Sequence, residues 1–452
     1  MGITAKGKKN AGLLTEGSIA KGILSFAIPL FLGQLLQQFY NVADAWVVGN
    51  FADNDSFAAV SSAGSLTFLI IGFFNGIAIG GGVVISKYFG ARDEKSVEVA
   101  IHTNFLFGLI ASALSTIVGL ILIPVLLRLM QTPENVLPAS LLYLRVYFAG
   151  VSTIIMYNIG MSIMRALGDS LHPLYYLFIS SVINVVLDLL FVAVFHWGVG
   201  GAAAATIIAQ GVSAVMCIYR MCKMEGVARL DFKKLHYNGP MMHEVITQGL
   251  PTGIQNSVIS IGNIVIQKNI NSFGSFAMAG VGAYSTCMSM ALPTFISQNL
   301  GAKEYKRAKK GAVFGIITGV AVAELIGIGF YIGIEPLLRF FVDEEQSVSY
   351  GEMHAHVTTL FFCLLAFSHC AAGVLRGCGK SIIPMAAMLA FWCGLRIVYV
   401  TTALQFIPKF TMISWAYPLT WSCSSIVFLL FLIFSDWTHA FEKKAAKSKV
   451  IK

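Results

Sequence analysis

Long apolar stretches separated by short charged or turn-forming segments dominate this sequence. Twelve stretches are long enough to cross a bilayer as helices; they lie near residues 23–50, 57–86, 100–127, 139–164, 172–195, 199–219, 246–270, 277–298, 311–334, 354–375, 381–406 and 412–435. A membrane-spanning helix needs about 20 apolar residues. The strict apolar–polar alternation of membrane β-strands is absent from the sequence. The pattern therefore predicts an all-α polytopic membrane protein with twelve transmembrane helices.

The composition agrees with a lipid environment. Charged residues make up 12% of the 452 residues and hydrophobic residues 56%, whereas soluble domains carry about 25% charged residues. A disordered chain, a disulfide scaffold and an ordinary soluble enzyme are excluded on these grounds. Membrane lipid is thus an expected partner of the chain.

The distribution of basic residues predicts the orientation in the membrane. Most of the 31 lysine and arginine residues fall on the side that holds the N-terminus, and the opposite side carries Arg128, Lys268, Arg339 and Lys409. Because cytoplasmic loops are enriched in basic residues, we expect both termini to be cytoplasmic and the protein to lie in the plasma membrane. The positive charge is a topology signal, since no basic surface interleaved with aromatic residues predicts nucleic-acid binding.

The sequence contains an internal repeat. The segment MRALGDSLHP at 164–173 recurs as LRGCGKSIIP at 375–384, so that Arg165 matches Arg376. Both halves start on the same side, which predicts two six-helix lobes related by a pseudo-two-fold axis along the membrane normal, an arrangement typical of transporters. The predicted parts are a cytoplasmic tail (1–22), an amino-terminal lobe (23–222), a cytoplasmic linker (223–245), a carboxy-terminal lobe (246–435) and a basic cytoplasmic tail (436–452).

The eighth span is expected to be shortened. Pro29 and Pro251 are equivalent positions offset by 222 residues, whereas Arg165 and Arg376 are offset by 211. The second half therefore lacks about eleven residues between Pro251 and Gly301, three helical turns. The residues that remain are still expected to cross the membrane.

The first span carries a polar stripe of Gln34, Gln37, Asn41 and Asp44, which lie within about 80° of arc on one helix face. The fifth span carries Asn184 and Asp188, one turn apart, while the fourth and sixth carry Asn158 and Thr206. Ionisable residues inside a membrane are costly and often functional. Carboxylate, amide and hydroxyl oxygens suit a hard monovalent cation or a proton. We therefore expect a cation or proton site made of Asp44, Asn158, Asn184, Asp188 and Thr206. Where the bound cation is Na⁺, Asp44 and Asp188 are expected to hold it.

The seventh span repeats the polar stripe but has Ile266 where the first has Asp44, so coupling to a cation is expected in the first half only. We expect the substrate path to be lined by polar residues of these two stripes and by methionines, namely Gln34, Gln37, Asn41, Asn256, Asn263, Met161 and Met290. The alternative interpretation of such polar groups is interhelical hydrogen bonding, and of the methionines, packing or lipid contact.

Signatures of catalysis are missing from the sequence. There is no HExxH motif and no GxxxxGKS loop. We therefore expect a transporter without enzymatic activity and without a cofactor other than the coupling ion.

Five segments together resemble the multidrug and toxic compound extrusion (MATE) family, in particular its bacterial drug-exporter branch. They are IPLFLGQLLQQFYNVADAWVVGN at 28–50, MRALGDSLHP at 164–173, NVVLDLLF at 184–191, GLPTGIQ at 249–255 and LRGCGKSIIP at 375–384. The resemblance implies a two-lobe secondary antiporter that exports organic cations or amphipathic compounds in exchange for Na⁺ or H⁺. It also implies that the family's amino-lobe cation site maps onto the five residues proposed above. The family's acidic residue after the AYS motif is absent here, where Ser285 is followed by Thr286.

Two other functions remain open from the sequence. A flippase for lipid-linked precursors of the same superfamily would need several cationic side chains in its cavity, and only Arg145 and Arg396 lie inside spans. A membrane enzyme would need a group of residues that forms a metal site or an activated nucleophile, and the sequence shows no such motif. A receptor would need no internal repeat, whereas this sequence has one. We expect a small cationic or amphipathic substrate and a monomeric protein.

Overall fold

The computed structural model describes residues 14–51, 54–129, 132–267, 275–341, 345–407, 409–443 and 446. The first half contains six membrane-crossing segments: α1 (Ile19–Phe51), α2 (Asn54–Gly90), α3 (Glu94–Leu129), α4 with α5 (Leu137–Ala149 and Val151–Ala166), α6 with the π-helix η1 (Leu171–Asp188 and Leu189–Val194), and α7 (Gly198–Lys223). Two short 3₁₀ helices, η2 (Gly226–Ala228) and η3 (Phe232–Lys234), follow in the linker.

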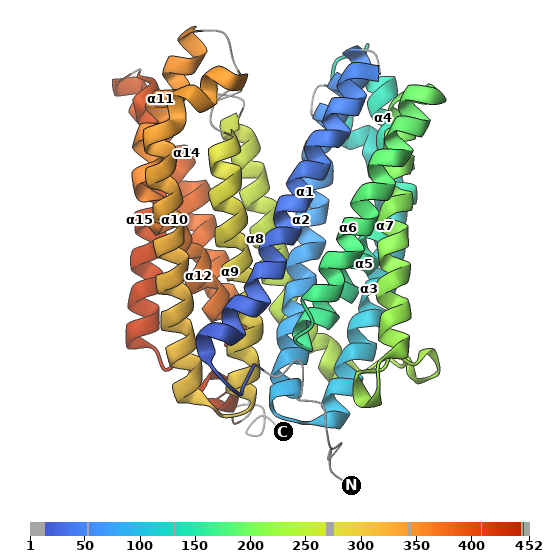
Figure 1. The fold of residues 1–452 in the computed structure, drawn as a ribbon, viewed down its shortest axis with the longest axis vertical. Coiled ribbons are helices and arrows are strands. Elements are labelled where there is room, and N and C mark those ends of the chain that lie inside the picture. The colour runs from blue at the N-terminus through green and yellow to red at the C-terminus, as the bar shows by residue number, and fades with distance from the viewer. Residues whose placement is uncertain are drawn as a thin grey trace.

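The second half repeats this order. Its segments are α8 (Gly239–Gln267), α9 (Ser275–Gly301), α10 (Tyr305–Phe341), α11 with the 3₁₀ turn η4 and α12 (Glu345–Thr358, Thr359–Phe361 and Phe362–Gly377), α13 with the π-helix η5 and α14 (Ile382–Met388, Leu389–Leu395 and Arg396–Phe406), and α15 (Phe410–Phe434). The two halves form two bundles that stand side by side (Figure 1). The twelve-helix, two-lobe prediction is confirmed.

Most of these helices suit a lipid environment. Among the described residues, nine helices are long and apolar enough to cross a membrane, and a tenth span is formed by α4 and α5, which bend by 47° at their junction. The remaining two, α8 and α9, both pack against α2. The chain is therefore an integral membrane protein.

The shortened eighth span is present. Helix α9 has 27 residues, whereas its counterpart α2 has 37. A helix of that length still extends about 40 Å, enough to cross a hydrocarbon core of about 30 Å. The loss therefore shortens α9 without removing a crossing.

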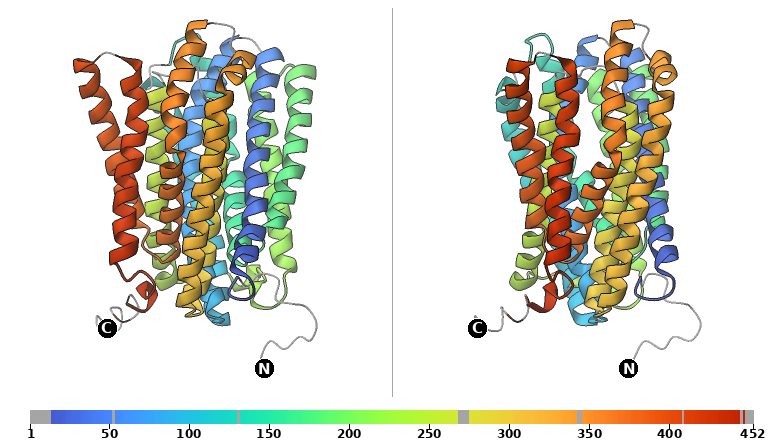
Figure 2. Two further views of the ribbon diagram at one scale, coloured as in Figure 1. Left: turned by 60° about the vertical axis from the view of Figure 1, so that its left-hand side comes forward. Right: turned by 90° about the vertical axis from the view of Figure 1, so that its left-hand side faces the viewer.

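Helix α1 connects the two bundles. Near its start, Ile23, Phe26 and Leu30 lie in a buried cluster with residues of α9, α10 and α12. Near its end, Val47 and Val48 pack with Val192 and Ala202 of the amino-terminal half. Both views in Figure 2 show the two bundles extending along the same direction. The boundary between tail and lobe at residue 22 stays a prediction, as do the other domain boundaries.

The two halves are in tight contact at the inner end of the molecule, by which we mean the end where α1 begins and α15 ends (Figure 1). Glycines allow α2 and α8 to approach at backbone distance: a Cβ at Gly80 would clash with Gly249, and one at Gly76 with Gly253. Such small-residue contacts are typical of packed membrane helices. The Ser297 hydroxyl of α9 donates to the Val83 carbonyl oxygen of α2 at 2.7 Å.

Residues 14–17, here called the N-terminal strap, bind to the opposite half of the molecule. The guanidinium of Arg307 on α10 donates to the carbonyl oxygens of Leu14, Glu16 and Gly17, at 2.7–3.2 Å. The buried Gln298 side chain accepts from the Leu14 amide at 2.8 Å and donates to the Ala166 carbonyl oxygen at 3.0 Å. Gln298 thus ties α9 both to the strap and to the end of α5.

Candidate functional site

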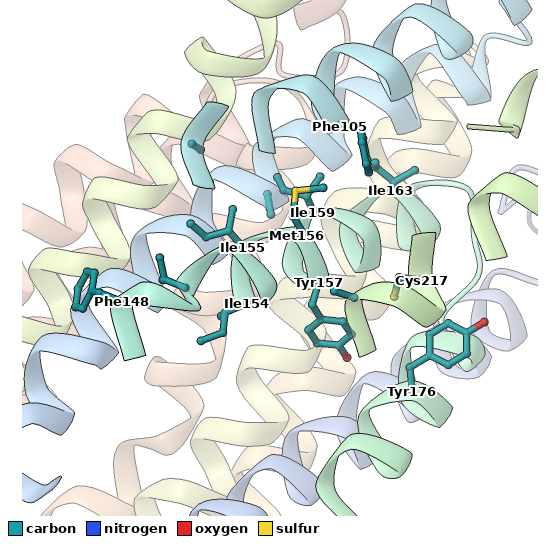
Figure 3. Close-up of a cluster of buried hydrophobic side chains, with 14 of the residues drawn as sticks. Phe105, Phe148, Ile154, Ile155, Met156, Tyr157, Ile159, Ile163, Tyr176 and Cys217 are labelled. Atoms are coloured by element: carbon teal, nitrogen blue, oxygen red, sulfur yellow. The ribbon is translucent and has the colours of Figure 1, made fainter. Parts of the chain in front are cut away.

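A cavity of ≈ 320 Å³ lies within the amino-terminal half, and Met290 of α9 contributes to its wall. The polar stripe of α1 forms one wall, because Gln34, Gln37, Asn41 and Asp44 all line it. The stripe faces inward because the opposite face of α1 carries apolar side chains such as Leu32 and Phe39, which are exposed at the surface of the fold. The wall behind the cavity is an apolar cluster that includes Ile154 and Tyr157 (Figure 3).

The two predicted acids meet beside this cavity. Asp44 lines the cavity, whereas Asp188, the last residue of α6, is fully buried. Their carboxyl groups are close enough to interact electrostatically, and Asn184 lies one helical turn before Asp188 on α6. The backbone widens into the π-helix η1 immediately after Asp188, a distortion that is common at functional sites.

Several oxygens of this cluster have no hydrogen-bond donor. Among the described residues, none donates to either carboxylate oxygen of Asp188, to Oδ1 of Asp44 or to the amide oxygen of Asn184. Buried polar atoms are usually paired, and two neighbouring carboxylates cannot both be ionised without a positive charge. This donor set fits a proton or a monovalent cation.

Neutral oxygens complete the cluster. Asn158 and Thr206 line the cavity. The Asn158 amide nitrogen donates to the Ile154 carbonyl oxygen at 2.8 Å, which leaves its side-chain oxygen available. The Tyr40 hydroxyl lies 3.5 Å from the Thr206 hydroxyl oxygen. Of the five residues of the predicted cation site, Asp44, Asn158 and Thr206 therefore line one cavity, and Asn184 and Asp188 are buried next to Asp44. Their role in binding a cation stays a prediction.

Sequence reasoning missed the tyrosines of this cavity, which are Tyr40, Tyr143, Tyr147 and Tyr157. Tyr143 and Tyr147 are one helical turn apart on α4, and their rings stack with centroids 6.0 Å apart. The spacing of Tyr143 and Tyr147, which places both on one face of the helix, could have indicated a cavity wall. A tyrosine in an apolar span is equally typical of a packed interface. Asn75, Gln210 and Arg165 also line the cavity and were not predicted.

The predicted substrate-path residues divide into three groups. Gln34, Gln37, Asn41, Met161 and Met290 line the cavity. Asn256 does not; its amide nitrogen donates to the Gly72 carbonyl oxygen at 3.2 Å, between α8 and α2. The Asn263 side chain lies outside the described residues. The assignment of Asn256 and Asn263 to the path stays a prediction.

The second half differs in electrostatics. Arg376 and Arg396 are buried there, and among the described residues neither forms an ion pair with a carboxylate. Arg396 donates to the Thr420 hydroxyl at 2.9 Å and lies 4.5 Å from the Tyr417 ring centroid. The fully buried acid, Asp188, thus belongs to the first half, and the two buried arginines without a carboxylate partner among the described residues belong to the second.

Comparison with known proteins places this architecture. The MatE family model matches residues 29–190 and 251–402. The chain is 27% identical to the probable multidrug resistance protein YpnP of Bacillus subtilis over 84% of this chain and 87% of the relative. It is 24% identical to the multidrug export protein MepA of Staphylococcus aureus over 59% of each chain.

Solved structures show the same fold. An outward-facing multidrug resistance MATE family transporter of the MOP superfamily aligns with a TM-score of 0.84 and 20% identity, covering 94% of this chain and 97% of that one. A MATE structure in the straight conformation aligns with a TM-score of 0.85 and 20% identity, covering 98% and 100%. The two matched stretches of the family model coincide with the two halves of the fold and together cover most of the sequence, and the chain therefore belongs to the MatE family.

Proposed function

We propose that this protein is a secondary antiporter of the plasma membrane that exports organic cations or amphipathic drugs in exchange for Na⁺ or H⁺. The observation that carries the proposal is the pair of neighbouring acids, Asp44 at the wall of a cavity large enough for a small molecule and Asp188 buried beside it. The names of the relatives, a probable multidrug resistance protein and a multidrug export protein, support drugs as the substrate class.

The orientation follows the basic residues. The inner end is cytoplasmic in this proposal, since Lys87, Arg92, Lys303 and Arg307 lie there and the positive-inside rule favours that side. Both termini are then cytoplasmic. One chain supplies both lobes and the whole cavity, so a monomer suffices for transport.

The coupling uses competition for negative charge. A cation that enters from outside neutralises the acid pair, and a cationic drug in the cavity then loses the carboxylate that held it. Return to an inward-facing form carries the cation to the cytoplasm. Each net inward elementary charge releases about 2.3 kcal/mol per 100 mV of membrane potential, enough to accumulate a neutral amphipathic drug outside by a factor of tens. One-for-one exchange of a monovalent cationic drug moves no net charge, so its export is driven by the concentration gradient of the coupling cation.

A flippase for lipid-linked pyrophosphates is the weaker alternative. Its headgroup would require several cationic side chains, whereas Arg165 is the single basic residue among the described residues that line the cavity. The acid pair, with Asp44 in the lining and Asp188 buried beside it, favours a substrate that carries positive charge.

The test is transport by purified protein in lipid vesicles. We expect ethidium to move when an inward Na⁺ gradient or a pH gradient is imposed, and collapse of each gradient separately identifies the coupling ion. Ethidium movement that is indifferent to both gradients contradicts the antiporter. Gradient-independent movement of a fluorescent pyrophosphate lipid supports the flippase instead.

A further inference from the structure

A second, smaller chamber lies beneath the cavity. It has a volume of ≈ 30 Å³, room for about one water molecule. Its walls include Gly82 of α2 and Thr294 of α9, which lie nearer the inner end than Asn75 and Met290 of the same two helices. On α5 both spaces reach Arg165. The chamber therefore continues the cavity toward the side that we propose to be cytoplasmic.

Five of the described residues line both the cavity and the chamber, and two of them, Met290 of α9 and Arg165 of α5, lie toward the inner end. Gln34 of α1 lines the cavity beside Met290. The Met290 sulfur lies 3.9 Å from the Gln34 amide nitrogen and 3.8 Å from a guanidinium nitrogen of Arg165. The row Gln34–Met290–Arg165, here called the floor, thus connects α1, α9 and α5.

The guanidinium is the distinctive member of the floor. An arginine is always protonated in proteins, so a positive charge stands where both spaces approach the inner end. A cation that leaves the acid pair for the inner end must pass close to this charge in surroundings of low dielectric constant, where like charges repel strongly. Positive groups exclude cations in this way in membrane pores.

We propose that the floor is the permeation barrier of the closed inner side and that Arg165 prevents the coupling cation from crossing without a conformational change. The inference rests on the proposed antiport, because a barrier to cations matters only where a cation binds in the cavity. It assigns a role that is separate from drug binding and cation binding. Arg165 prevents the cation from crossing when no drug is exported, so that transport occurs only as exchange.

The test measures drug-independent cation flux in vesicles. Purified protein is reconstituted with a pH-sensitive or Na⁺-sensitive dye inside, and an interior-negative potential is applied without drug. Arg165→Gln is expected to raise H⁺ or Na⁺ influx by about tenfold or more, because the positive charge that repels the cation is lost. Arg165→Lys keeps the charge and is expected to stay as tight as the unchanged protein.

A charge-cancelling variant keeps the proposal testable if Arg165→Gln does not fold. Met290→Glu leaves Arg165 in place and sets a carboxylate beside it, so it is expected to raise the same influx. The matched control is Arg376→Gln, the repeat-related arginine, which donates to Ser289 at 3.1 Å and lines neither space. It is expected to leave the influx unchanged.

The outcomes separate this inference from the proposed function. Gradient-driven ethidium export by the unchanged protein is measured in the same vesicles, and its absence overturns the proposed function itself. Export that is present, together with tight Arg165→Gln and Met290→Glu variants, overturns the barrier alone. Equal leaks from Arg165→Gln and Arg376→Gln, or from Arg165→Gln and Arg165→Lys, also overturn it, because the effect is then one of packing and not of charge at the floor.

Discussion

Asp44 at the outer half of α1 and Asp188 at the end of α6 are neighbours whose carboxyl groups interact electrostatically, although they come from different helices of the first lobe. Asp188 is fully buried and Asp44 faces the cavity. A single group therefore connects the space where a substrate fits to the buried site where a small cation fits. Competition between the two ligands follows from this proximity.

We predict that Asp44→Asn and Asp188→Asn each lower gradient-driven ethidium export at least about tenfold, because an amide neither holds a cation by charge nor releases a proton. Export from vesicles containing each variant is the measurement. Asp231→Asn is the matched control, since Asp231 lies in the linker, where its carboxylate accepts from the Lys233 amide. Normal ethidium export by both Asp44→Asn and Asp188→Asn would contradict the assignment of the cation site.

Asn256 and Gln37 offer a test of the substrate path. The Asn256 side chain bridges α8 and α2, so Asn256→Ala is expected to lower the free energy of unfolding by about 1 kcal/mol and to leave ethidium affinity unchanged. Gln37 lines the cavity, and Gln37→Ala is expected to weaken ethidium binding. Thermal unfolding in detergent and ethidium fluorescence titration distinguish the two. A large affinity loss in Asn256→Ala instead supports its predicted place in the path.

The N-terminal strap predicts a local change in dynamics. Arg307→Ala removes the guanidinium that binds three strap carbonyl oxygens. Hydrogen bonds to charged groups contribute about 1.5–3 kcal/mol each. We therefore expect amide hydrogen exchange in residues 14–17 to accelerate about tenfold or more. The exposed neighbour Lys306 provides the control, and equal acceleration in Lys306→Ala contradicts a specific role for Arg307.

Close packing of α2 and α8 predicts a stability loss from one methyl group. A Cβ at Gly80 clashes with the backbone of Gly249, so Gly80→Ala is expected to lower the free energy of unfolding by about 1–3 kcal/mol. Gly333→Ala, on a part of α10 with no atom within 4 Å of the new Cβ, is expected to be neutral or slightly stabilising. Thermal unfolding of the two variants in detergent measures the difference. Equal melting temperatures would show that the helices separate without cost.

The sequence by itself determined the number of spans, the duplication and the residue types of the candidate site. Hydrophobic length is a local property, since lipid imposes it on each helix separately, and the repeat needs only alignment of the chain with itself. The polar stripe of α1 was predictable for the same reason: four residues on one helix share a face whatever the other helices do.

Contacts between residues of different helices depend on the tertiary structure. Asp44 and Asp188 lie close together because α1 packs against α6, and no periodicity within either helix specifies that neighbour. Asn256 belongs to a stripe as regular as that of α1, yet close contact between glycines draws α8 onto α2 and turns Asn256 to a backbone carbonyl. Arg165 and Arg376 are equivalent in sequence, but one lines the cavity and the other is buried against α9, because the packing around repeated helices is not itself repeated.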